Sequence, residues 1–196
     1  MAIKLVIVAA TVAILPQAVH AAEIVGRRGD WEIFRDSKSC GMTRSYEGAG
    51  ATEMMLIRYA GGNIRVMITN MGWSAKQGAL YDISYVVNGA SYGGAKAVGT
   101  AERDRKGFVS TFVGRFADDF AQGSLLQVLL AGKEIERLPL NGSGAALSLI
   151  DQCLVRVRAD LATAEREQAK RADLPKDPFA SSPEPRRPTP RIKGPR

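Results

Sequence analysis

The side chains that most often carry reactive chemistry are scarce in this sequence. It contains two cysteines, Cys40 and Cys153, and one histidine, His20, which lies in a segment that we expect to be removed. Hydrolytic triads need an imidazole, and a nucleophilic thiol needs a nearby cation or imidazole to hold its thiolate. Zinc sites draw mainly on histidine and on several cysteines. The remaining chain is therefore unsuited to Ser-His-Asp, Cys-His and zinc chemistry, and we expect neither a metal nor a cofactor.

The two cysteines are 113 positions apart and are most simply interpreted as one disulfide. In the chain-entropy model, closing a loop of about 100 residues stabilises a fold by ~4.7 kcal/mol. The alternative is that Cys40, which precedes a glycine, is a reactive thiol. The lack of an imidazole in the mature chain favours the bridge between Cys40 and Cys153.

Other polar clusters fit structural roles better than catalytic ones. Asp118 and Asp119 are adjacent, and neighbouring helical residues point about 100° apart, so they fit the wet side of a short helix rather than an acid-base pair. The mixed charges of residues 102–106 fit a solvated loop. The backbone of residues 141–144 could hold an anion, but it lacks the spacing of a phosphate loop or a nucleophile elbow, and Ser143 fits a helix cap.

A group of aromatic residues is the candidate ligand surface. The segment 70–78 carries Trp73, one of only two tryptophans, and three tyrosines lie in or near the following hairpin. Together they could form a surface for a glycan or a peptide. The alternative, which we favour, is that Trp73 folds inward to plug one end of the fold. The residues of this candidate surface are Trp73, Lys76, Tyr81, Tyr85 and Tyr92.

The first 22 residues have the pattern of a secretory signal peptide. Lys4 precedes an apolar stretch from Leu5 to Leu15, then come Pro16 and the small or modest residues 19–21. Eleven apolar residues are too few to cross a hydrocarbon layer of ~30 Å as a stable helix, and no longer apolar run follows. The alternatives are an uncleaved anchor or a buried first helix. We expect a periplasmic or secreted protein, with no transmembrane span after cleavage.

The pattern of residues 23–140 predicts mainly short strands. Hydrophobic residues make up 45% of the chain, and here they alternate with polar ones over short runs that end at Gly, Asn or Ser. Residues 53–59 and 63–70 form one predicted hairpin across Gly61-Gly62, and residues 79–87 and 90–98 form another across Asn88-Gly89. We expect about nine strands in an antiparallel β-sandwich or barrel.

Two helices and a tail complete the predicted organisation. Residues 115–122 place Phe116 and Phe120 on one helical face, and a longer helix is expected from about Gly144 towards Ala172. Its apolar stripe fades beyond Leu161. We therefore divide the chain into a signal peptide (1–22), a disulfide-bridged β-rich domain (23–153), a solvent-projecting helix extension (154–173) and a disordered tail (174–196).

The positive charge is concentrated near the C-terminus. Residues 23–153 carry 15 Lys and Arg against 14 Asp and Glu, whereas residues 154–196 carry 11 against 6. The tail could tether the protein to an anionic surface such as lipid head groups, or it could simply aid solubility. Export and the lack of stacking aromatics argue against nucleic acid. The cations of this candidate tether are Arg186, Arg187, Arg191, Lys193 and Arg196.

Trp31, Cys40 and the stretch 138–147 resemble the invasion-associated locus B type of small exported bacterial proteins. The resemblance covers roughly residues 30–153. That family usually has further cysteines in its middle, which this chain lacks. The resemblance implies an envelope or secreted protein without known catalysis, and it assigns no site residue.

We therefore expect an exported, non-enzymatic binding or envelope-associated protein whose partner is a protein or a glycan of the cell envelope. Two alternatives remain open at this point. One is a polysaccharide hydrolase that uses two carboxylates, which needs no histidine. The other is an inhibitor of exported proteases.

Overall fold

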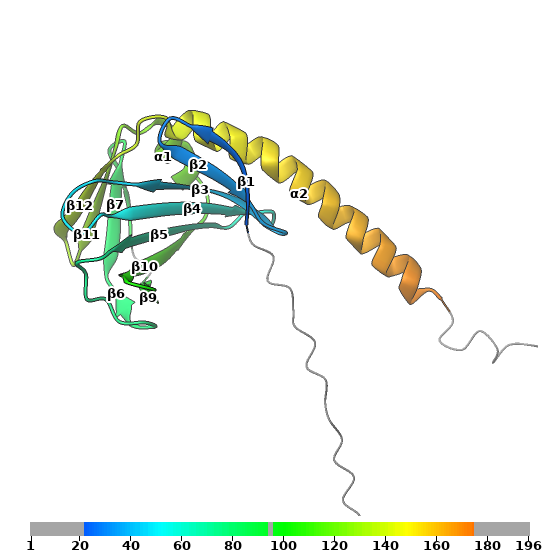
Figure 1. The fold of residues 1–196 in the computed structure, drawn as a ribbon, viewed down its shortest axis with the longest axis horizontal. Helices are drawn as coiled ribbons and strands as arrows, with labels where there is room; N and C mark the ends of the chain where they lie inside the picture. The colour runs from blue at the N-terminus through cyan, green and yellow to red at the C-terminus, as the bar shows by residue number, and fades with distance from the viewer. Residues whose placement is uncertain (1–21, 94–95, 175–196) are drawn as a thin grey trace, which may run out of the picture.

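The structure is a computed structural model that describes residues 22–93 and 96–174. Its described part contains twelve strands in two antiparallel sheets and two helices (Figure 1). The strands of the larger sheet are β1 (Glu23–Arg28), β2 (Trp31–Arg35), β3 (Ser39–Ser45), β4 (Glu53–Tyr59), β5 (Ile64–Asn70), β6 (Leu80–Tyr81), β9 (Ala97–Glu102) and β10 (Arg105–Phe112). The smaller sheet contains β7 (Ile83–Val87), β8 (Ala90–Tyr92), β11 (Leu125–Leu130) and β12 (Lys133–Pro139).

The strand order follows mostly from consecutive hairpins. The larger sheet has the order β1-β2-β3-β4-β5-β10-β9-β6, and the smaller sheet has the order β12-β11-β7-β8. Every pairing between neighbours is antiparallel. The predicted mainly-β antiparallel architecture with a C-terminal helix is confirmed.

The first predicted hairpin is confirmed in detail. Strands β4 and β5 pair from Glu53 to Arg58, and Gly62 supplies a φ of +96° in the turn. A positive φ is accessible to glycine at little cost, which explains why this turn uses a Gly-Gly pair.

The second predicted hairpin is present but divided between the sheets. Asn88 and Gly89 have φ values of +50° and +76° and turn β7 into β8, as expected. The outer parts of the same two segments form β6 and β9, which pair with each other in the larger sheet. Each segment was expected to be one strand, but each contributes a strand to both sheets: β6 and β7 are separated by Asp82, and β9 begins at Ala97 after β8 has ended at Tyr92. This division, together with the unexpected β1, explains why twelve strands occur where about nine were predicted.

The core lies between the facing surfaces of the two sheets. Along β3, β4 and β5, alternate residues such as Met42, Leu56 and Val66 are fully buried, because successive side chains of a strand point to opposite faces. The smaller sheet contributes Tyr85 and Val128 from the other side. On β3 the inward-facing row continues from Met42 to the polar residue Arg44.

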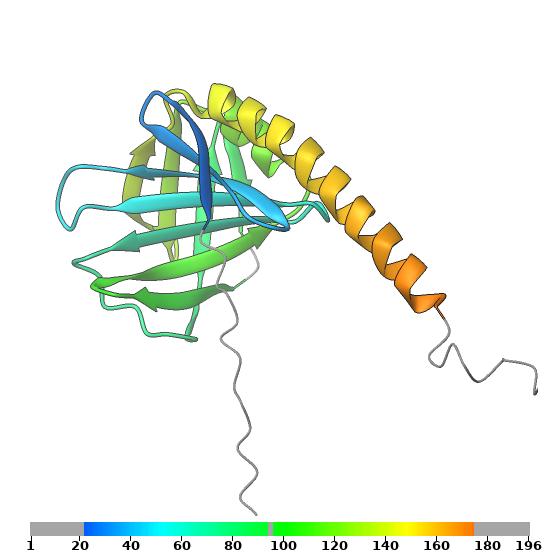
Figure 2. The same ribbon diagram turned by 45° about the vertical axis from the view of Figure 1, so that its right-hand side comes forward.

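Two helices close one end of the core. Helix α1 (Phe116–Gln122) buries Phe116 and Phe120, as predicted. Helix α2 (Ser143–Ala172) buries one face of its first four turns and is exposed after Val157, apart from the half-buried Leu161. Both views show α2 continuing past the sheets (Figures 1 and 2). None of the described helices is both long enough and apolar enough to cross a membrane.

The expected cap of α2 is wrong in one detail. Gly142, with a φ of +82°, occupies the N-cap position, and Ser143 is the first helical residue. Ser143 is 1% exposed, and its Oγ donates to the Phe120 carbonyl of α1 at 3.0 Å. The serine thus fastens the two helices together instead of capping its own helix.

The predicted disulfide joins Cys40 of β3 to Cys153 of α2, with their Cα atoms 6.2 Å apart. It fixes the buried half of α2 against the larger sheet. The signal peptide, except for residue 22, lies outside the described residues. So does the tail from residue 175 onward, including all of its candidate cations.

Candidate functional site: a polar cleft between the two sheets

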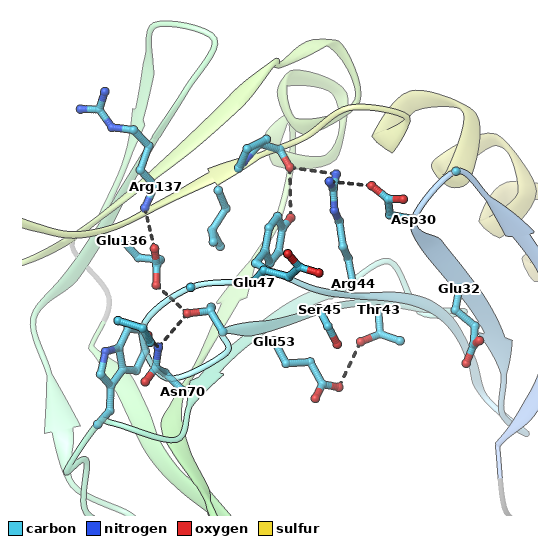
Figure 3. Close-up of a pocket in the computed structure, with 18 of the residues that line it drawn as sticks. Asp30, Glu32, Thr43, Arg44, Ser45, Glu47, Glu53, Asn70, Glu136 and Arg137 are labelled. Carbon is cyan, nitrogen blue, oxygen red and sulfur yellow. Dashed lines mark hydrogen bonds and ion pairs between the residues drawn. The ribbon is translucent and has the colours of Figure 1, made fainter.

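A large cavity lies where β3 and the loop after it face the edge strand β12. Its volume is about 1160 Å³. Figure 3 shows charged and polar side chains from both sheets around it. Its lining residues are Arg27, Gly29, Asp30, Glu32, Thr43, Arg44, Ser45, Tyr46, Glu47, Gly48, Ala49, Thr52, Glu53, Asn70, Trp73, Ile135, Glu136, Arg137, Leu138 and Pro139.

Arg44 bridges one end of the cleft. It shares the inward-facing row of β3 with Met42, so its side chain points across the gap towards the smaller sheet. Its Nη1 donates to Pro139 O at 3.2 Å and to Asn141 O at 3.4 Å, and its Nη2 lies 2.7 Å from Asp30 Oδ2. Arg44 therefore links β3, the β1–β2 turn and the chain that leads into α2.

Two aromatic rings hold the Arg44 guanidinium group. Its Cζ lies 4.8 Å from the Tyr46 ring centroid and 5.7 Å from that of Trp31, both within cation–π range. The buried Nε makes no hydrogen bond within the described part of the chain. Burial raises the pKa of Tyr46, and its hydroxyl donates to Pro139 O at 3.2 Å. This end of the cleft is thus held in a fixed shape.

A hydrogen-bonded chain crosses the other end. Thr52 Oγ1 donates to Glu136 Oε2 at 2.6 Å, and Asn70 Nδ2 donates to Thr52 Oγ1 at 2.8 Å. Asn70 Oδ1 accepts from Gly72 N–H at 2.7 Å. Asn70 is 3% exposed, and these hydrogen bonds satisfy its buried amide within the protein. The hydrogen bond between Thr52 and Glu136 fixes the loop before β4 to β12.

The cleft has more carboxylates than guanidinium groups. Its carboxylates are Asp30, Glu32, Glu47, Glu53 and Glu136, and its guanidinium groups are Arg27, Arg44 and Arg137. Arg27 pairs with Glu32, Arg44 with Asp30, and Arg105, from outside the lining, with Glu53.

Two carboxylates of the cleft have no cationic partner among the described residues. Arg137 is directed to Glu134 of its own strand at 2.9 Å, and its hydrogen bonds hold the pKa of Glu134 below the usual value. Within residues 22–93 and 96–174, Glu47 and Glu136 form no ion pair. The cleft is therefore a concave polar surface with two carboxylates, Glu47 and Glu136, that have no ion-pair partner in the described part of the chain.

Three residues of the predicted aromatic surface lie together, at a different cavity. Trp73 stacks on Phe108 with ring centroids 5.5 Å apart, and Tyr81 Oη accepts a hydrogen bond from Lys76 N–H at 2.8 Å. Trp73 and Tyr81 line a cavity of about 280 Å³ with apolar neighbours such as Leu130. Trp73 packs against the core, as the favoured alternative predicted, while one side of it also borders the polar cleft.

The other two predicted residues do not extend this surface. Tyr85 is 1% exposed, and its hydroxyl hydrogen-bonds to that of Ser110 at 2.7 Å inside the core. Tyr92 is half-buried, its hydroxyl donates to Asp119, and it packs edge-on against Phe116. Tyr85 and Tyr92 lie on β7 and β8 of the smaller sheet and pack inward. The five predicted residues therefore do not form one surface.

The residues that build the cleft were not found from the sequence. Arg44, Tyr46, Glu47 and Glu136 are separated by up to 92 positions, and only the packing of one sheet on the other brings them together. One signal was available: residues 133–137 carry four charges among five residues, which is typical of a protected edge strand.

The described residues contain no cluster of three or more His, Cys, Asp or Glu side chains that could hold a metal ion. The cleft offers hydrogen bonding and charge rather than a nucleophile with its base. Its side chains are suited to bind a polar or positively charged group.

The fold and the cleft define a two-sheet β protein with a disulfide-linked terminal helix. Among solved structures, the crystal structure of invasion associated protein B from Bartonella henselae is similar, with a TM-score of 0.51 and 16% sequence identity. The match covers 71% of this chain and 99% of that chain. No protein-family model and no curated protein matches the chain. The resemblance expected from the sequence is thus confirmed at the level of the fold.

Proposed function

We propose that this chain is an exported, non-enzymatic binding protein of the cell envelope, and that the polar cleft is its binding surface. A disulfide between distant residues is typical of oxidising compartments outside the cytosol. The similar fold of a protein named for its association with invasion supports a role in the envelope.

The observation that carries the proposal is that Glu47 and Glu136 line a cleft of about 1160 Å³ and form no ion pair with the described residues. Ligand sites are concave and place a few polar groups to fix orientation. Side-chain contacts hold both ends of the cleft, so little conformational freedom is lost on binding.

The hydrolase alternative has less support. A general acid is usually a carboxyl group kept protonated by apolar surroundings. Glu47 is exposed, and Glu136 accepts hydrogen bonds from Thr52 Oγ1 and from Arg137 N–H. Asp30, Glu32 and Glu53 are each paired with an arginine. The cleft therefore fits recognition better than acid–base chemistry.

Site-specific photocrosslinking tests the proposal. A photoreactive residue replaces Ser45 inside the cleft or, as the matched control, the exposed Val155 on α2. The full-length protein is expressed in bacteria and irradiated in intact cells. We expect a discrete crosslinked species from position 45 that is absent from position 155. The same species from both positions, or from neither, would refute the cleft as the binding surface.

A further inference from the structure

The edge of β12 that faces the cleft carries backbone groups that none of the described strands pairs. β12 is the outer strand of the smaller sheet and pairs with β11 on one side only. Leu140 N–H donates to Ser124 O at 2.9 Å, so residue 140 turns its backbone groups towards β11. Since these groups alternate along an antiparallel strand, Pro139 and Arg137 turn theirs to the other side.

The hydrogen bonds at this edge confirm that the backbone groups of Pro139 and Arg137 point away from β11. Pro139 O accepts from Arg44 and from Tyr46 across the cleft. Arg137 N–H donates to Oε1 of its neighbour Glu136 at 3.1 Å. A side chain thus occupies the amide at which an added strand would pair, which is one way that proteins protect an exposed edge.

An incoming strand could replace the hydrogen bond between Arg137 N–H and Glu136. If an incoming strand accepts a hydrogen bond from Arg137 N–H, Glu136 Oε1 is released and can pair with a cation of the same strand, while Oε2 keeps its hydrogen bond from Thr52. Glu47 lies among the lining residues of the same cleft and supplies a second unpaired carboxylate. The cleft volume of about 1160 Å³ exceeds that of the usual small-molecule pocket, as an extended peptide requires.

From this arrangement we propose that the cleft binds an extended basic peptide segment of a partner protein, which adds as a strand to β12 and pairs its Lys or Arg side chains with Glu47 and Glu136. This inference rests on the proposed binding function and names its partner class. Strand addition supplies main-chain hydrogen bonds, and the alternating side chains supply specificity.

A fluorescent seven-residue peptide that alternates lysine and valine is the probe, titrated into the oxidised full-length chain. A peptide that alternates glutamate and valine tests charge, and a lysine–valine peptide with N-methylated backbone amides tests strand pairing. We expect saturable binding of the first peptide and no binding of the second. The third peptide should bind at least about tenfold more weakly than the first, because main-chain hydrogen bonds are lost. Higher salt should weaken the binding.

Variants locate the contact. Glu47→Gln and Glu136→Gln should each weaken binding about two- to fivefold, the range for partly exposed ion pairs. Glu165→Gln on the exposed part of α2 is the matched control and should leave the affinity unchanged. Equal unfolding midpoints of the variants establish that they are folded.

Three results would overturn the inference: no binding of the lysine–valine peptide, equal binding of the N-methylated peptide, or equal binding of the glutamate–valine peptide. Binding seen only after Arg186, Arg187, Arg191 and Lys193 of the full chain are changed to Gln would instead assign the cleft to the chain's own C-terminal residues. A crosslink from position 45 without peptide binding would refute the strand-addition inference and leave the proposed function standing.

Discussion

Arg44 shows how one side chain can define the shape of a site. It contacts Asp30, Tyr46, Trp31 and the Pro139 carbonyl, which come from three separate parts of the chain. Its side chain is 12% exposed, so these contacts replace most of its hydration. A partly buried guanidinium group is costly to leave unpaired, and the ion pair with Asp30, the carbonyl acceptors and the two aromatic rings offset this cost for Arg44.

We predict that Arg44→Gln lowers the free energy of unfolding by about 1–3 kcal/mol, because hydrogen bonds to a charged group and cation–π contacts are lost. The matched control is Arg27→Gln, whose side chain is 75% exposed and should contribute less than about 1 kcal/mol. Urea unfolding followed by tryptophan fluorescence measures both. Equal effects of the two substitutions would contradict the role assigned to Arg44.

A pH dependence follows from the buried tyrosines. Loss of hydration and the hydrogen bond to Asp119 raise the pKa of Tyr92 to about 12, and burial raises the pKa of Tyr85 as well. An unfolded tyrosine titrates near pH 10, so the unfolded chain releases these protons first. The stabilisation is complete below about pH 10 and is lost as the pH rises towards 12.

Urea unfolding at pH 8 and pH 11 should therefore give a lower free energy of unfolding at the higher pH. Lysines also titrate in this range, so Tyr92→Phe provides the control. We expect the variant to lose less stability than the parent between the two pH values. An identical loss in both proteins would show that Tyr92 does not contribute.

For single residues, the features that depend on local rules could be predicted from the sequence. The cysteine pair could be predicted because the chain offers no other cysteine partner. The inward orientation of Tyr85 could not, since alternation predicts two faces but does not say which face another sheet will cover.

Among the elements, α2 depends on the bond between Cys40 and Cys153. The helix is attached to the larger sheet by this disulfide and by ion pairs such as Arg58–Asp151, and its last four turns are exposed. Isolated polar helices are only marginally stable, so most of the helical order comes from the attached half.

Replacing both cysteines with alanine should lower the free energy of unfolding by up to about 4–5 kcal/mol, as the chain-entropy model gives for a loop of this size. Urea unfolding of the oxidised protein and of the variant measures the difference. Reduction of the parent protein with a thiol is the independent control and should shift the midpoint in the same direction. Unchanged midpoints after reduction would show that α2 is held by packing alone.

The elements were predicted where a turn or a strict alternation marked them. The hairpin of β4 and β5 was found because Gly-Gly separates two alternating runs. The division of the next hairpin was missed because a strand that changes sheets keeps its alternation on both sides of the bend. β1 was missed because all but one of its residues are exposed, so no apolar face marks it.

The whole molecule creates the cleft, since neither sheet contains it. Arg44 and Glu47 come from the larger sheet and the loop after it, whereas Glu136 and Arg137 come from β12 of the smaller sheet. These residues are far apart in the sequence, and no short motif predicts which strand edge will face which loop. Of the five residues in the predicted aromatic surface, Trp73 lines the cleft, and it also lines the smaller apolar cavity together with Tyr81.

Backbone nuclear magnetic resonance of the full-length, oxidised protein tests the central claim most directly. During titration with the lysine–valine peptide, the amide signals of Arg137, Ser45 and Glu47 should shift, and the Arg137 amide should become protected from hydrogen exchange. The amides of Lys76 and Val113, outside the cleft, should stay unchanged. Shifts confined to residues outside the cleft, or an Arg137 amide that exchanges as fast with the peptide as without it, would contradict the account.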